Sequence, residues 1–152
     1  MQPPIRDAAA QAALLESADP VLAANKQLVY DMYRIVVQGG QWSRAHEFIA
    51  EGYIQHNPNV VSGRAALEDF LRNSRPARPE EATIMLPLIT VIAERDLVLV
   101  VNQRPEKDDD GAEYLTTWFD LFRIEDGLIA EHWDPALKSP AMLKFDPNSK
   151  RR

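Results

Sequence analysis

The chain has 152 residues, which suits one domain with a substantial core. Its net charge of -6 argues against a nucleic-acid surface, which needs clustered positive charge, and the lack of cysteine excludes disulfides and thiolate sites. No apolar run approaches the roughly 20 residues that span a bilayer, and the first residues lack the apolar core of a signal peptide. We therefore expect a cytoplasmic protein with neither a nucleic-acid nor a membrane partner, although a chain that has lost its signal peptide would show the same pattern.

The N-terminal part is expected to hold a long helix behind a loose segment. Residues 1–19 are rich in alanine and weakly patterned, which indicates a flexible arm or a frayed helix. Asp19 is suited to cap a helix whose first residue is Pro20, because its carboxylate accepts from free N–H groups and proline fits the first turn. Apolar residues then recur at helical spacing until Gly39-Gly40 ends the pattern.

Two shorter helices are predicted next, with an extended segment between them. The first covers about 42–48, and an extended segment at 53–58 follows because its final proline restricts the residue before it. Ser62 is suited to cap the other helix, over about 63–73, which carries apolar residues on one face. Residues 75–79 have the composition of a linker.

The second half is predicted to be all strand. Residues 83–93 and 96–104 form one predicted pair, residues 105–111 form a polar loop, and strands at 114–124 and 128–134 follow. Helices first and a meander of strands afterwards indicate an α+β fold, with helices on one face of an antiparallel sheet.

The turn of the last hairpin permits two registers. If Glu125-Asp126-Gly127 is a three-residue loop with a left-handed glycine, Asp120 lies opposite His132 on one face of the sheet. If the loop is only two residues long, Asp120 faces Trp133 and His132 moves to the other face. We favour the three-residue loop, because a turn followed by a glycine bulge is common.

Asp120 is the leading candidate for chemistry, because an ionisable group inside an apolar strand is costly unless it is paired. Burial beside Trp118 and Phe122 would suit it to act as an acid or a base near neutrality. The alternatives are a structural acid paired with Arg104 or Arg123, and an acid that faces solvent.

His132 and His56 are two of only three histidines, and imidazole suits proton transfer at neutral pH. With Asp120 or Asp134 they could also form a set of two histidines and one carboxylate around a metal. No local spacing of metal ligands supports that arrangement, so we predict no metal.

Pocket walls are typically apolar with few polar groups. The candidates for substrate binding are Tyr33, Tyr53, Asn57, Asn102, Trp118, Phe122 and Trp133.

Four segments carry a resemblance to a known family. They are Tyr53-Ile54-Gln55-His56-Asn57-Pro58, Gly63-Arg64, the hairpin Phe119–Ile129, and Glu131-His132-Trp133-Asp134. The chain resembles the NTF2-like superfamily, closest to its SnoaL-like polyketide cyclase branch, over about residues 20–137. The resemblance implies a cystatin-like cone, in which three N-terminal helices pack on a curved antiparallel sheet around a deep apolar pocket. It also implies chemistry without a bound cofactor, and it leaves residues 1–19 as a flexible arm and 138–152 as a tail.

The resemblance extends to ketosteroid isomerase at single positions. Tyr33 falls where that family keeps a hydrogen-bond-donating tyrosine, and Asp120 falls where it keeps a protonated aspartate. Asn57 falls where it keeps the carboxylate base, and an asparagine cannot abstract a proton. Steroid isomerisation by that mechanism is therefore not implied, and in the SnoaL-like branch Asp120 becomes the natural acid or base.

We therefore expect an acid/base enzyme, independent of any cofactor, that acts on a small or medium apolar carbonyl compound. Aldol cyclisation, isomerisation and dehydration all fit. The alternatives are a non-catalytic module that binds a small ligand, and a water-activating hydrolase of the epoxide hydrolase type. The predicted outer face, with Leu115, Thr117, Phe119 and Leu121, is apolar enough to predict a homodimer through the sheet.

Overall fold

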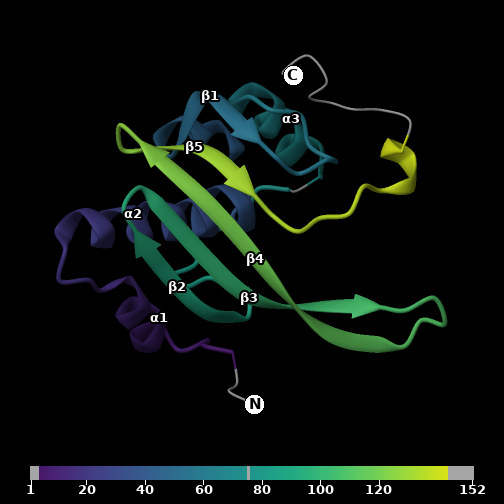
Figure 1. Ribbon diagram of the computed structural model, residues 1–152, viewed down its shortest axis with the longest axis horizontal. Coiled ribbons are helices and arrows are strands. Elements are labelled where there is room, and N and C mark those ends of the chain that lie inside the picture. Colours follow the sequence, from purple (N-terminus) through teal and green to yellow (C-terminus); the bar gives the residue numbers. More distant parts are fainter. Residues whose placement is uncertain (1–3, 75, 144–152) are drawn as a thin grey trace.

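The computed structural model describes residues 4–74 and 76–143, which form helices packed against one sheet (Figure 1). In chain order, the helices are α1 (Ala8–Leu15), α2 (Pro20–Asp31), the π-helix η1 (Met32–Gln38), the 3₁₀-helix η2 (Trp42–Glu47), α3 (Arg64–Ser74) and the 3₁₀-helix η3 (Pro140–Met142). The strands are β1 (Ile49–Gln55), β2 (Leu88–Glu94), β3 (Leu97–Lys107), β4 (Glu113–Glu125) and β5 (Leu128–Trp133).

The sheet has the order β1-β5-β4-β3-β2, and α2 and α3 lie against one of its faces (Figure 1). The expected α+β architecture is confirmed. Every neighbouring pair is antiparallel except β1 and β5, which run parallel, so the sheet is mixed rather than purely antiparallel. No helix within the described residues has the length and apolar character needed to cross a membrane.

The first long helix begins where the sequence predicted. Asp19 Oδ1 accepts from the backbone N–H groups of Val21 at 2.8 Å and Leu22 at 3.4 Å, and Pro20 is the first helical residue. The predicted helix is not α-helical throughout, because its last seven residues form the π-helix η1. Such wide turns are rare in proteins and are frequent at functional sites.

Gly40, just after η1, lets another segment of the chain pass very close. Its φ is +63°, and a Cβ atom on it would lie 2.6 Å from the carbonyl oxygen of Pro76. The backbone N–H of Arg78 also donates to the carbonyl of Gly39 at 2.8 Å. The glycine pair therefore does more than end a helix, because it also fixes the segment around 76–78 against that helix end.

The N-terminal segment is packed, which differs from the loose arm or frayed helix that we expected. The side chain of Gln11 on α1 is fully buried and makes four hydrogen bonds. Its Nε2 donates to the carbonyls of Ile5 and Ile84, while its Oε1 accepts from the Ile84 N–H and the Tyr30 hydroxyl. Ile5 also bridges to Leu88, at the start of the edge strand β2. The hydrogen bonds of Gln11 hold α1 against its neighbours. The spacing of apolar residues therefore did not indicate that this segment is packed.

The turn of the β4–β5 hairpin corrects the predicted register. Glu125 pairs with Leu128, so the loop is the two residues Asp126 and Gly127, with φ values of 51° and 75°. Two successive positive φ values define a turn whose twist matches that of the flanking strands. The three-residue loop that we favoured is wrong.

A bulge in β5 still places His132 on the predicted face of the sheet, although Asp120 does not lie directly opposite it as predicted. Ile124 pairs with Ile129 but Arg123 pairs with Glu131, so Ala130 is an extra residue on β5. Beyond this bulge Phe122 lies opposite His132. A one-residue shift exchanges the two faces of a strand, so the bulge turns His132 to the face of the sheet that carries Asp120.

Strands β3 and β4 extend past their neighbours as a two-stranded arm. Within the described part of the chain, residues 104–107 pair only with residues 113–116, and the polar loop is shorter than the predicted 105–111. Leu115 and Phe119, on the outer face, are 59% and 48% exposed. The homodimer through this face stays a prediction.

We expect Gln11→Ala to lower the free energy of unfolding by about 2 kcal/mol or more, because it leaves buried partners of the amide unsatisfied. Denaturant unfolding measures this value. The matched control is Gln27→Ala on the exposed side of α2, which should change stability by no more than about 0.5 kcal/mol. Equal effects of the two substitutions would show that α1 does not contribute to the core.

Candidate functional site

A cavity of about 380 Å³ lies between the helices and the inner face of the sheet. Its walls are mainly apolar, with Met32 and Val37 from η1, Leu67 and Leu71 from α3, and Phe122 from β4. Its polar lining consists of Tyr33, Tyr53, Gln55, Asn57, Arg104, His132 and Asp134. Four of the predicted substrate-binding residues therefore line it, namely Tyr33, Tyr53, Asn57 and Phe122.

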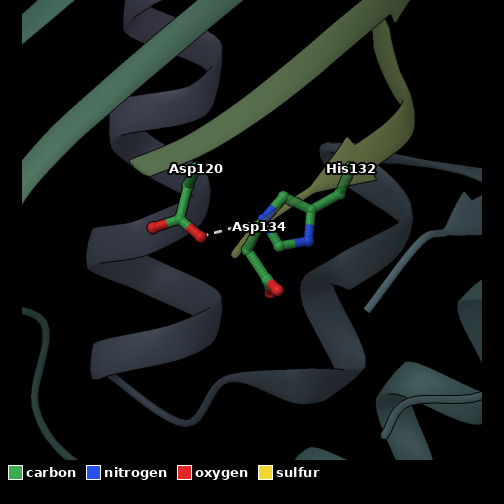
Figure 2. Close-up of side chains that lie close together, drawn as sticks. All are labelled: Asp120, His132 and Asp134. Carbon is green, nitrogen blue, oxygen red and sulfur yellow. Dashed lines mark hydrogen bonds and ion pairs between the residues drawn. The ribbon is translucent and has the colours of Figure 1, made fainter. Parts of the chain in front are cut away.

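Asp120 and His132 form a buried polar pair beside this cavity (Figure 2). His132 Nε2 lies 3.0 Å from Asp120 Oδ1, and the two residues are only 8% and 6% exposed. The indole Nε1–H of Trp118 donates to the same carboxylate oxygen at 3.1 Å. The His132 ring stacks on Phe122, with ring centroids 4.5 Å apart. The alternative of an ion pair with Arg104 or Arg123 is not what the structure has, since the partner of Asp120 is His132.

Gln55 determines which ring nitrogen of His132 carries hydrogen. The Asn57 backbone N–H donates to Gln55 Oε1 at 2.9 Å, and Gln55 Nε2 donates to the Tyr53 hydroxyl at 3.1 Å, which fixes the orientation of the amide. His132 Nδ1 lies 3.0 Å from that same Oε1, so Nδ1 must be a donor. A neutral imidazole that carries its hydrogen on Nδ1 has none on Nε2. The hydrogen bond between His132 Nε2 and Asp120 Oδ1 therefore requires a second proton, which either group can carry. The pair thus holds one transferable proton.

Two tyrosines offer hydroxyl groups to the site. Burial raises the pKa of Tyr33 well above its ordinary value, and the charge of the nearby Asp120 carboxylate raises it further. Burial also raises the pKa of Tyr53, with smaller contributions from Asp134 and Asp120. Both hydroxyls therefore stay protonated at neutral pH and can donate to a ligand oxygen. The Tyr33 ring meets Phe122 edge to face, with centroids 5.8 Å apart.

Asp134 is a second carboxylate at the site, and sequence reasoning considered it only as a metal ligand. One ligand atom each from Asp120, His132 and Asp134 lie within 4.8 Å of one another (Figure 2). Asn57 Nδ2 donates to Asp134 Oδ2 at 2.7 Å, so this amide orients a carboxylate. The signal for Asp134 was its spacing, because residues two apart along an extended chain point the same way.

The same three groups are the donors that could hold a cation. Carboxylate oxygens and an imidazole nitrogen suit several divalent metals. However, Asp120 Oδ1 and His132 Nε2 already bond to each other, so a cation there would displace their shared proton. That the protein works without a metal stays a prediction.

A second cavity, of about 650 Å³, adjoins the first. Tyr33, Val37 and Arg104 line both cavities, so the two meet at these residues. Asp120 faces the second cavity and His132 faces the first, which places the pair between them. The predicted ligand-binding residues Asn102 and Trp118 line the second cavity as well.

The structure does not bring His56 and Trp133 into either cavity. Trp133 follows His132 on β5, so it points to the opposite face, and His56 stacks on it with centroids 4.7 Å apart. His56 Nε2 lies 3.0 Å from Glu131 Oε2, and the His56 side chain is 41% exposed. The bond from His56, together with Arg123, lowers the pKa of Glu131. His56 therefore belongs to a surface cluster that stabilises the hairpin, and its expected catalytic role has no geometric basis.

Comparison with protein families gives one match, to the SnoaL-like domain, over residues 29–132. The matched segment starts within α2 and ends at His132, so it contains both members of the buried pair. No curated protein matches the chain.

Solved structures with this fold share little sequence with the chain. A candidate polyketide cyclase from Acidithiobacillus ferrooxidans is 14% identical with a TM-score of 0.54, covering 78% of this chain and 89% of that one. An LEH-like epoxide hydrolase from M. tuberculosis is 13% identical with a TM-score of 0.53, covering 73% and 80%. An NTF2-like protein of unknown function from Cytophaga hutchinsonii is 16% identical with a TM-score of 0.51, covering 73% and 96%. These likenesses show the fold alone.

We expect long-range ¹H–¹⁵N NMR to find a hydrogen on Nδ1 of His132, slow to exchange because it is buried. Gln55→Leu removes its acceptor, so the protected Nδ1–H signal should be lost. Gln41→Leu, which changes a glutamine bonded at the surface, is the matched control and should leave the signal in place. A protected Nδ1–H in Gln55→Leu would contradict the proposed control of the ring by Gln55.

Proposed function

The chain belongs to the SnoaL-like domain family, and from this premise we propose that Asp120 and His132 transfer a proton on the carbon next to a carbonyl group of a small or medium apolar ligand. The observation that carries the proposal is the 3.0 Å contact between Asp120 Oδ1 and His132 Nε2, buried between two cavities. A carboxylate and an imidazole that share one proton can both accept and return a proton near neutral pH.

The steps follow from that shared proton. When it resides on His132, Asp120 is a carboxylate and can take a proton from the carbon next to the carbonyl. The electron pair of the broken C–H bond moves onto the carbonyl oxygen and forms an enolate. The enolate then follows one of three routes. It attacks a second carbonyl, whose oxygen takes up the C=O electron pair and the proton from Asp120; it takes the proton back at another carbon; or it expels a hydroxyl group that leaves as water with the proton from Asp120. These outcomes are aldol cyclisation, isomerisation and dehydration.

Two side chains of the second cavity, Asn102 and Tyr33, can donate to the enolate oxygen, and the Tyr33 hydroxyl also contacts the Asp120 carboxylate. The Asn102 side chain lines the second cavity, is only 3% exposed, and has no hydrogen-bond partner among residues 4–74 and 76–143. Tyr33 lines both cavities, and its raised pKa keeps its hydroxyl protonated. Preorganised donors of this kind commonly supply the largest catalytic effect. Asn57 is less suited to that role than expected, since its amide already bonds to Asp134.

Asp134 supports a second candidate function, in which the site activates water to open an epoxide. Two carboxylates and an imidazole could share the task of orienting a water molecule, and their ligand atoms lie within 4.8 Å of one another. Asp134 would be the second carboxylate that such an arrangement needs.

Hydrogen–deuterium exchange tests the first candidate without its natural substrate. In D₂O the protein should accelerate deuterium incorporation next to the carbonyl of 4-phenyl-2-butanone, measured by NMR. We expect Asp120→Asn to reduce this acceleration by about 10²-fold or more, because the proton acceptor is lost. Asp69→Asn, which makes the same charge change on the exposed face of α3, is the control. Binding of the ketone without any acceleration would favour a non-catalytic binding module.

Hydrolysis of styrene oxide in H₂¹⁸O tests the second candidate. A water-activating site should give a diol with one ¹⁸O atom, detected by mass spectrometry, and Asp134→Asn should slow its formation by about 10²-fold. Asp108→Asn in the loop of the hairpin arm is the control. No diol above the protein-free background would remove this candidate and leave the proton-transfer proposal standing.

A further inference from the structure

The second cavity is lined by more positive than negative groups, although the chain as a whole carries a charge of -6. Arg78 and Arg104 both line it, and Asp120 is the one acid among its described lining residues. The Oδ1 atom of Asp120 is already held by His132. Because His132 already occupies this carboxylate, none of the described residues that line the cavity offers a free acid to the two guanidinium groups.

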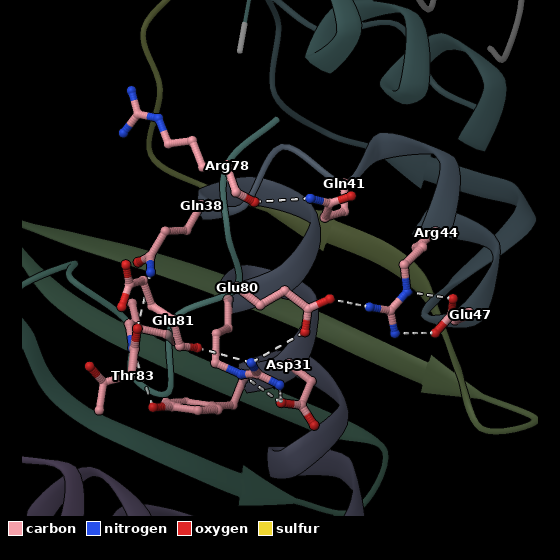
Figure 3. A network of polar contacts seen from close by, with 12 residues as sticks. Asp31, Gln38, Gln41, Arg44, Glu47, Arg78, Glu80, Glu81 and Thr83 are labelled. Atoms are coloured by element: carbon pink, nitrogen blue, oxygen red, sulfur yellow. Dashed lines mark hydrogen bonds and ion pairs between the residues drawn. The ribbon is translucent and has the colours of Figure 1, made fainter. Parts of the chain in front are cut away.

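Arg78 differs from its neighbours in having no acidic partner. Arg34 pairs with Asp31 and Arg44 pairs with Glu47, but Arg78 makes no ion pair with any described residue. Figure 3 shows the Arg78 guanidinium pointing away from the acids of this network, while its neighbours are joined to theirs.

The backbone of Arg78 is nevertheless firmly held. Its N–H donates to the Gly39 carbonyl at 2.8 Å, and its carbonyl accepts from Gln41 Nε2 at 2.9 Å (Figure 3). The close passage at Gly40 fixes the preceding residues against the end of η1. The backbone of Arg78 is therefore fixed beside the cavity, while its side chain is exposed.

Arg104 brings the second guanidinium to the same cavity from β3. It stacks over the Trp118 ring at 3.9 Å from the centroid, and its Nε pairs with Glu106 at 2.6 Å. Glu106 does not line this cavity, so that ion pair leaves one side of the guanidinium facing the cavity. Asn102, two residues earlier on the same face of β3, adds its amide to the lining of the same cavity.

We propose that the second cavity binds a carboxylate group of the ligand, with Arg78 as the residue that selects for it. The ligand is then a keto acid, whose carbonyl oxygen lies at Asn102 and Tyr33 and whose carboxylate extends to the arginines. The inference that the ligand has a keto group rests on the proposed function. The inference that it has a carboxylate does not, because a non-catalytic binding module would show the same preference for a carboxylate. Guanidinium is suited to a carboxylate because its planar donors match the two oxygens.

A pair of matched probes tests the carboxylate preference by calorimetry. The probes are 4-phenylbutanoate and 4-phenylbutanamide, which have the same shape and differ in charge. Wild-type protein should bind the carboxylate more tightly than the amide. Arg78→Ala should weaken carboxylate binding roughly three- to fivefold, as expected for an exposed ion pair, and leave amide binding unchanged.

Two further variants complete the test. Arg6→Ala makes the same change in net charge at an exposed position outside the cavity, so it should leave both affinities unchanged. Arg78→Lys keeps the charge and should retain most of the preference for the carboxylate.

Equal binding of the two probes, no binding of either at millimolar concentration, or equal effects of Arg78→Ala and Arg6→Ala would overturn the proposal. Asp120→Asn should keep the carboxylate preference even though it slows deuterium exchange, so failure of the one proposal is distinguishable from failure of the other.

Discussion

The contact between Asp120 and His132 is the constraint on which the rest of the site depends. Two ionisable groups can stay buried in an apolar layer only when each satisfies the other. The contact requires both side chains on one face of the sheet, which the bulge at Ala130 provides. It also requires a ring of fixed orientation, which Gln55 and the stack on Phe122 provide. The backbone bulge and the contacts of the imidazole ring thus both serve to align His132 Nε2 with Asp120 Oδ1.

The π-helix η1 connects the helical layer to this contact. Tyr33 and Val37 both lie on it and both line the two cavities, so one short segment forms the wall between them. The wider turn ends at Gly39 and Gly40, where the segment that carries Arg78 is attached. One helix end therefore positions both Tyr33, which lines the two cavities, and the segment that carries Arg78.

Much of this could be predicted from the sequence, and the failures have physical causes. The start of α2 at Asp19 and Pro20 follows from local capping chemistry. That Asp120 and His132 share one face of the sheet was predicted, but from a turn that is wrong, and Phe122 rather than Asp120 lies opposite His132. The length of the turn and the bulge together decide which face a residue of β5 occupies, and the sequence did not reveal the bulge. The docking of α1 through Gln11 escaped prediction, since one buried amide leaves no periodic pattern.

The two-stranded arm at the end of β3 and β4 has a consequence for the cavity wall. Among the residues that the structure describes, 104–107 and 113–116 pair only with each other, and an isolated hairpin is marginally stable in water. Fraying of this arm moves Arg104 and leaves the pairing of β4 with β5 intact. Loss of pairing in the arm would therefore alter the cavity wall at Arg104, while the pairing of β4 with β5 would keep Asp120 and His132 aligned.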